Sequence, residues 1–194
     1  MITLDPPRGT ADKANPWQEL GLSPSGLGRF LSAAQKGVGL QGAVDVLLAD
    51  DATLKRLNKT FRGKNKATDV LSFPAGATTV FFGEPDGPEL AGDLAISLET
   101  AARQAAQHGH SLRDEVRVLL LHGVLHLAGF DHEVDSGEMA AREAELRRKL
   151  GVGIGLIART AVPKAKAEKR TKATLRSATS SKRKKVAARG KVRG

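Results

Sequence analysis

Apolar residues recur along this chain at two spacings, and each spacing predicts a different kind of element. Between Ser25 and Ala34, and again between Ser136 and Leu150, they return every three or four positions, which is typical of amphipathic helices. Shorter apolar runs that are bounded by turn-forming or acidic residues predict β-strands. We expect strands at Ala43 to Ala49, Thr68 to Phe73, Thr79 to Phe82 and Leu90 to Leu98, the last three in one sheet.

Three further helices are marked by capping residues in front of them and glycines behind them. They are expected from Asp51 through Asn58, after Ser97 up to Gly109, and after Ser111 up to Gly129. The third is almost continuously apolar in its second half. We therefore expect that helix to lie in the core.

The length of the chain predicts one domain. A chain of 194 residues exceeds the usual domain of about 100 to 150 residues only modestly. We expect a loose lead-in over residues 1–18, a folded domain over 19–157 and a disordered basic tail over 158–194. The tail has few large apolar side chains to offset the entropy that ordering would cost.

The net charge of +10 is distributed unevenly along the chain. From Arg159 to Gly194 there are fourteen Lys or Arg residues against the single acid Glu168, whereas the remaining chain has seventeen basic and twenty acidic residues. The basic character therefore belongs to the tail, where it suits contact with RNA phosphates. It says little about the character of an active site.

Composition also excludes several classes of protein. No apolar run approaches the ~20 residues that cross a bilayer, so we expect no membrane partner. The first ten residues include Asp5 and two prolines where a secretory signal would be basic and then apolar, so the cytoplasm is the expected location. Cysteine is absent, which leaves imidazole and carboxylate as the ligands for any transition metal.

Three of the five histidines are spaced in a way that suits one metal ion. His122 and His126 lie four residues apart on the predicted core helix, so they project from the same face. Gly129 permits a left-handed turn that brings His132 back over that face. Three imidazoles with a fourth position open for water are a frequent catalytic zinc set. We therefore predict one Zn²⁺ ion, with nickel, cobalt and iron as alternatives.

The same spacing occurs in the metzincin proteases, which carry a glutamate directly after the first histidine as the general base. In this chain that position is Gly123. A peptidase would therefore lack its expected proton acceptor. A zinc peptidase is accordingly the least favoured of the functions that three histidines would suit.

The stretch from His122 to His132 closely resembles the signature of the YbeY family. Two earlier blocks are also similar to family motifs. The first runs from Leu57 to Pro74, and the second from Gly92 to Ser97. Together with residues 107–110 and Glu115 the similarity covers roughly residues 40 to 150, and three motifs in order are far more specific than one.

The resemblance implies a single α+β domain with a small mixed β-sheet flanked by helices, and a metal site on the core helix and the turn after it. It implies a single-strand-specific, metal-dependent endoribonuclease acting in 16S rRNA 3′-end maturation and in ribosome quality control. The implied partners are ribosomal RNA and the small ribosomal subunit, with ribosomal proteins and an assembly GTPase as further candidates. Arg62 stands at the position of the family's functionally important arginine, and a guanidinium can hold phosphate bidentately.

Other residues near these motifs are further candidates. Asp131 and Glu133 flank the third histidine and could orient an imidazole from behind. Lys64, Lys66 and the basic tail from Arg159 to Arg193 could contact RNA. The main rival function is a non-catalytic assembly factor that binds ribosomal RNA and holds a structural zinc. Such a factor would leave RNA uncut with or without metal.

Overall fold

The computed structural model describes residues 1–5, 16–75 and 89–153. These residues all belong to one compact unit, Met1–Ala158. The strand expected at Thr79 to Phe82 and the basic tail lie outside the described residues.

The described chain contains four strands and six helices, and its second half runs from two consecutive strands into three consecutive helices, which is compatible with an α+β domain. The strands are β1 (Ile2–Leu4), β2 (Ala43–Ala49), β3 (Val70–Pro74) and β4 (Leu90–Ser97). The helices are α1 (Pro16–Glu19), α2 (Pro24–Val38), α3 (Asp51–Arg62), α4 (Leu98–His108), α5 (Leu112–Leu127) and α6 (Glu138–Leu150). No helix among these residues is long and apolar enough to span a membrane.

The strands form one mixed sheet in the order β1-β2-β4-β3, which confirms the predicted sheet type. β1 and β4 both pair with β2 in parallel, and β3 pairs with β4 in antiparallel fashion. The structure differs from the sequence-based expectation at the N-terminus, where Ile2–Leu4 form an edge strand within the expected loose lead-in. Three residues are too few to show a period of two, and the open edge of β2 supplies their hydrogen-bond partners.

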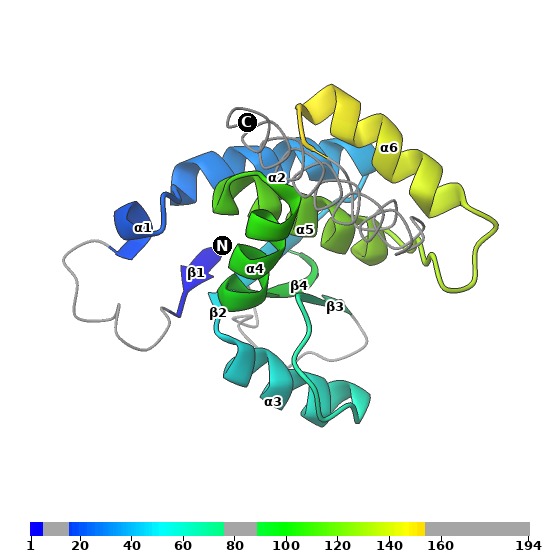
Figure 1. Ribbon diagram of the computed structural model, residues 1–194. Coiled ribbons are helices and arrows are strands. Elements are labelled where there is room, and N and C mark those ends of the chain that lie inside the picture. Colours follow the sequence, from blue (N-terminus) through cyan, green and yellow to red (C-terminus); the bar gives the residue numbers. More distant parts are fainter. Residues whose placement is uncertain (6–15, 76–88, 154–194) are drawn as a thin grey trace, which may run out of the picture. The chain divides into compact units, whose positions relative to one another are not determined.

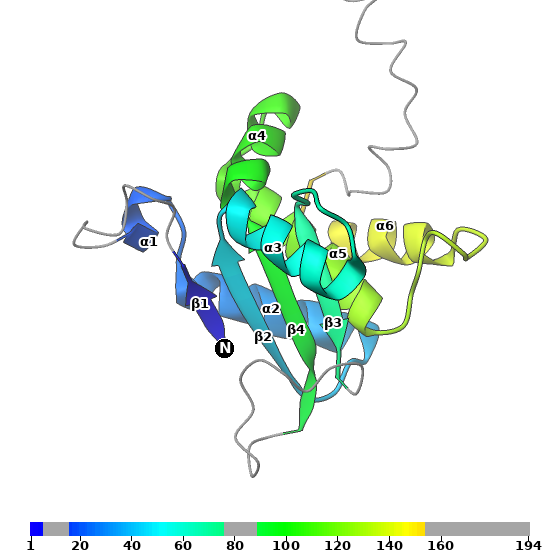
Figure 2. The same ribbon diagram turned by 90° about the horizontal axis from the view of Figure 1, so that it is seen from below.

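Helices cover the two faces of the sheet unequally, so the domain has three layers (Figures 1 and 2). α2 and α5 pack on one face, where Val46, Leu48 and Ile96 join them in the main core. α3 lies on the opposite face over a smaller cluster that includes Leu54 and Ala95. Because side chains alternate along a strand, β2 and β4 contribute to both clusters.

The helix ends follow from capping chemistry. Side chains of Ser23, Asp50, Ser97 and Ser111 each accept a hydrogen bond from a backbone N–H in the first turn of α2, α3, α4 and α5. α3 runs past the predicted Asn58 to Arg62 and ends at Gly63, whose φ is 68°. This extra turn makes Arg62 the last residue of the helix.

Candidate metal centre

The three predicted ligands meet at the C-terminal end of α5. His122 and His126 are one turn apart on that helix, and Gly129, with a φ of 88°, turns the chain so that His132 returns to them. The ring centroids of His122 and His126 are 4.8 Å apart, and His132 lies 5.3 Å from each. Their candidate ligand atoms all lie within 4.8 Å of one another. A search of the described residues for three His, Cys, Asp or Glu side chains that could hold a metal ion finds these three histidines.

The orientation of the rings fits a transition-metal ion. Nε2 of His122 and Nε2 of His126 are 3.2 Å apart, close to the ~3.3 Å between ligand atoms that tetrahedral zinc bonds of ~2.0 to 2.1 Å would give. The other nitrogen of His122, Nδ1, is 3.2 Å from Oε1 of Glu143. His122 is buried, His126 is half-buried and His132 is exposed, so the site opens on the His132 side.

The electrostatics of the group favour the protonation state that metals need. Burial lowers the pKa of His126, and the neighbouring imidazoles of His122 and His132 lower it further. Asp131 and a hydrogen bond with the Phe130 backbone act in the opposite direction. A lowered pKa keeps the imidazole of His126 neutral, and neutral imidazole is the form that coordinates metal.

The structure gives a packing reason for Gly123. A Cβ atom at this position would lie 2.7 Å from Cδ2 and 3.1 Å from Cδ1 of the buried Leu94 on β4. Gly123 therefore lets α5 approach the sheet closely, and a larger residue there would require the Leu94 side chain or α5 to shift. A glutamate at the position of the metzincin general base would therefore be crowded against β4.

A cleft of about 640 Å³ opens beside the histidines. α3 contributes Phe61 and Arg62 to its wall, although these residues are far from the histidines in sequence. Its other lining residues are Thr68, Asp69, Val70, Ser72, Phe73, Pro74, Gly129, Phe130, Asp131 and Glu133. The fold thus brings the predicted phosphate-binding arginine and the predicted metal ligands to one cavity.

Of the remaining candidates, Asp131 and Glu133 lie at the cleft, whereas Lys64 and Lys66 are not among its lining residues. Asp131 and Glu133 both line it, and Oδ1 of Asp131 accepts a hydrogen bond of 3.0 Å from the backbone N–H of Glu133. Lys64 and Lys66 are exposed on the turn after α3. Buried Asn58 holds this turn, because its Nδ2 donates to the carbonyl of Lys66 at 2.8 Å. The tail from Arg159 to Arg193 lies outside the described residues.

Sequence reasoning missed Glu143. This residue of α6 is only 2% exposed, and its side chain reaches His122. A signal was present in the sequence, since Glu143 follows Met139 by four residues and precedes Leu146 by three. All three are buried, so the acid lies in the apolar stripe of an amphipathic helix.

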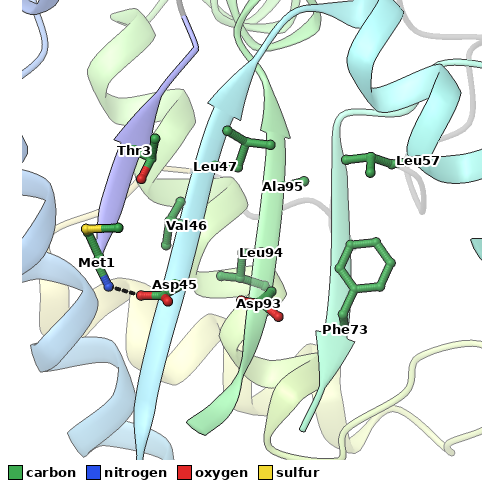
Figure 3. Close-up of a pocket in the computed structure, with 10 residues that line it drawn as sticks. All are labelled: Met1, Thr3, Asp45, Val46, Leu47, Leu57, Phe73, Asp93, Leu94 and Ala95. Atoms are coloured by element: carbon green, nitrogen blue, oxygen red, sulfur yellow. Dashed lines mark hydrogen bonds and ion pairs between the residues drawn. The ribbon is translucent and has the colours of Figure 1, made fainter. Parts of the chain in front are cut away.

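A second, shallow hollow of about 40 Å³ lies on the sheet face that carries α3 (Figure 3). Its lining is mostly apolar, with the carboxyl groups of Asp45 and Asp93 close together. Asp45 pairs with the N-terminal amine, whereas Oδ1 of Asp93 has no hydrogen-bond partner among the described residues. The lining of this hollow contains no histidine, and Phe73 borders both it and the metal cleft.

Known proteins similar to this chain carry a common description. The family described as Endoribonuclease YbeY matches residues 27–151. The Endoribonuclease YbeY of Koribacter versatilis is 51% identical over 152 residues, which cover 78% of this chain and 93% of that protein. Those of Solibacter usitatus (51% over 131 residues, 68% and 82% coverage) and Aquifex aeolicus (40% over 146 residues, 75% and 85%) are also similar. A solution structure from Thermotoga maritima aligns with a TM-score of 0.47 and 26% identity, over 77% of this chain and 89% of that one.

Proposed function

We propose, since the chain belongs to the YbeY family of endoribonucleases, that it cuts single-stranded RNA with a metal ion held by His122, His126 and His132. The proposal rests on one observation: the three imidazoles and Arg62 line the same cleft. Zinc is the proposed ion. The proposed setting is 16S rRNA 3′-end maturation and ribosome quality control in the cytoplasm, with the small ribosomal subunit as partner.

The proposed reaction divides the work between the metal ion and Arg62. When bound, the ion supplies Lewis acidity and a nucleophile at neutral pH. The guanidinium of Arg62 can donate two parallel hydrogen bonds to a phosphate and stabilise the charge that grows on it in the transition state. The end of α3 positions Arg62, because Gly63 returns its backbone N–H to carbonyls of the last turn and Asn58 holds the turn beyond.

Aromatic side chains in the cleft support a preference for single strands. Phe61, Phe73 and Phe130 all line it, and the rings of Phe61 and Phe73 meet edge to face with centroids 5.3 Å apart. All three side chains are half-buried. The part of such a ring that faces the cleft can stack on an unpaired base, and this stacking tolerates any sequence. Bases in a duplex are already stacked on one another and would not reach these rings. The basic tail remains a proposed contact for RNA phosphates outside the cleft.

The test measures metal content and RNA cleavage together, on wild type, His126→Ala and Arg62→Lys. The substrate is a single-stranded RNA that carries the 3′ end of precursor 16S rRNA. We expect the wild type to hold one equivalent of metal and to cut, and His126→Ala to lose both properties. Arg62→Lys should keep the metal and the fold but lose most cleavage, because a point charge does not reproduce a bidentate contact.

Each part of the proposal has its own contrary result. A wild type that holds metal but leaves RNA uncut would favour the non-catalytic assembly factor. Cleavage by Arg62→Lys at the wild-type rate would remove the arginine from the reaction. The product ends separate two routes, because a 2′,3′-cyclic phosphate would indicate attack by the neighbouring ribose hydroxyl rather than by water.

A further inference from the structure

We infer that Glu143 is the positioning residue of the metal centre, where it holds the ring of His122 in the tautomer and orientation that metal binding requires. The inference rests on the proposed function, because it takes the three histidines to be metal ligands. It adds a residue from α6 to a site that is otherwise built from α5 and the turn after it.

The geometry at His122 assigns a role to each ring nitrogen. Nε2 points at Nε2 of His126, 3.2 Å away, and Nδ1 lies 3.2 Å from Oε1 of Glu143. A carboxylate can only accept hydrogen bonds, so in the inferred arrangement Nδ1 of His122 carries the ring proton and donates a hydrogen bond to Oε1 of Glu143. The lone pair of the neutral ring is then on Nε2, the nitrogen directed at the other ligands.

Packing does not account for an acid at this position. Glu143 and His122 are both buried, and Met139 and Leu146 flank Glu143 on the inner face of α6. A buried carboxylate loses its hydration, and an apolar side chain of similar size would usually fill such a position at least as well. The acid therefore serves its hydrogen-bonded partner, and that partner is a metal ligand.

The acids predicted for this role from sequence make different contacts. Asp131 and Glu133 lie in the turn that carries His132, and Asp131 accepts a hydrogen bond from the backbone of Glu133. Glu143 instead comes from a separate helix that packs on both α2 and α5. This arrangement couples two events: metal binding favours one orientation of His122, and that orientation favours the docked position of α6.

The experiment compares Glu143→Leu and Glu143→Gln with wild type. Leucine removes the acceptor and keeps most of the bulk, whereas glutamine keeps an acceptor of the same shape and removes the charge. Zinc affinity is measured by competition with a chelator, and thermal unfolding is measured on the metal-free proteins. Nitrogen-15 NMR of the zinc-loaded proteins reports which nitrogen of His122 carries the proton.

We expect Glu143→Leu to weaken zinc affinity by about 10- to 100-fold, the range typical for residues that orient a metal ligand. The metal-free variant should unfold at the wild-type temperature or above it. Glu143→Gln should weaken zinc binding less than Glu143→Leu does. In the wild type the proton should be found on Nδ1 of His122. Zinc should slow amide hydrogen exchange in α6, and this protection should be smaller in Glu143→Leu.

Glu115→Gln is the matched control. Glu115 is also a buried glutamate that bonds a histidine, but its partner is His110, which is not one of the three ligands. The control should leave zinc affinity unchanged.

If Glu143 has a purely structural role, its substitution would lower the unfolding temperature without a separate effect on zinc affinity.

Wild-type zinc affinity in a folded Glu143→Leu would overturn the inference and leave the proposed function intact. If that variant does not fold, Glu143→Gln decides, and unchanged affinity together with a proton on Nε2 of His122 would overturn the inference. A wild type that binds neither zinc nor another transition metal would overturn both proposals.

Discussion

α5 contributes one residue to each of two histidine–glutamate pairs, and the pairs differ in what surrounds the histidine. Near the start of the helix, fully buried Glu115 bonds Nε2 of His110 in the preceding turn. Near its end, His122 bonds Glu143 of α6. The ring of His110 has another imidazole beside it, that of His108, stacked at 6.0 Å. His122 has two imidazoles beside it, with ligand atoms converging on one point.

This difference separates a structural contact from a candidate site. A carboxylate can orient an imidazole in either place, because the hydrogen-bond chemistry is the same. Only at the end of α5 does the opposite ring nitrogen face other nitrogens at the spacing that a metal ion needs. Convergence of several ligands, rather than burial of one pair, distinguishes the metal centre.

The largest expected effect is on metal binding when each histidine is removed in turn. His122→Ala should weaken zinc affinity by more than about 100-fold, because loss of a ligand exceeds the effect of losing a group behind it. His110→Ala should leave zinc affinity unchanged. Chelator competition on the two purified variants measures this contrast, and similar losses in both would erase the distinction between the pairs.

The stability of the metal-free protein should depend on Glu115 and not on Glu143. Glu115→Gln should lower the free energy of unfolding of the metal-free protein by about 1 to 3 kcal/mol, because it weakens a buried hydrogen bond to a charged group. Glu143→Leu should leave it unchanged or raise it, since leucine suits the apolar stripe of α6. Urea unfolding at neutral pH checks this. Equal destabilisation by both changes would mean that both pairs are structural.

A substitution at Gly123, next to His122, tests how closely α5 packs on the sheet. Gly123→Ala places a Cβ 2.7 Å from Cδ2 of Leu94. Overpacking of this kind costs about 1 to 3 kcal/mol, and the higher helix propensity of alanine offsets up to about 1 kcal/mol of it. We expect the free energy of unfolding, measured by thermal unfolding, to fall by about 1 kcal/mol.

Gly28→Ala in α2 is the matched control for this change. A Cβ at Gly28 would meet nothing within 4 Å, so alanine there should be neutral or stabilising. If Gly123→Ala proves as well tolerated as Gly28→Ala, the close approach of α5 to β4 does not constrain that position.

Asp93 is an acid that bonds no imidazole among the described residues. We expect its substitution to change stability least. Burial raises the pKa of Asp93, and repulsion from Asp45 raises it further. The folded protein therefore holds this proton more tightly than the unfolded chain does. Stability from this group is lost as pH rises from 3.8 through the folded pKa.

Asp93→Asn should accordingly stabilise the protein at pH 7 by less than about 1 kcal/mol, and the gain should shrink as pH falls toward 4. Urea unfolding of both proteins across this pH range measures the change. A gain that does not vary with pH would show that ionisation of Asp93 is not its source.

Much of the fold could be predicted because its signals are local. β2 was expected at Ala43 to Ala49, where the structure has it, and Ser111 caps α5 as predicted. Boundaries were less accurate where tertiary contacts decide them. β3 continues to Pro74, one residue beyond its expected end at Phe73. It lies at the edge of the sheet that the described residues form, where a residue without an N–H is tolerated. β1 depends on an open strand edge that no pattern within three residues reveals.

The sequence by itself determined the set of candidate metal ligands. His122, His126 and His132 lie on one helix and the turn that follows, so the helical repeat and the conformational freedom of Gly129 set their relation. The tertiary structure decided which other groups reach them. Arg62 arrives from α3 across the edge of the sheet, and Glu143 arrives from α6. Spacing along a chain says which residues share a face of one helix, but which face meets which neighbour depends on how the helices and the sheet pack together.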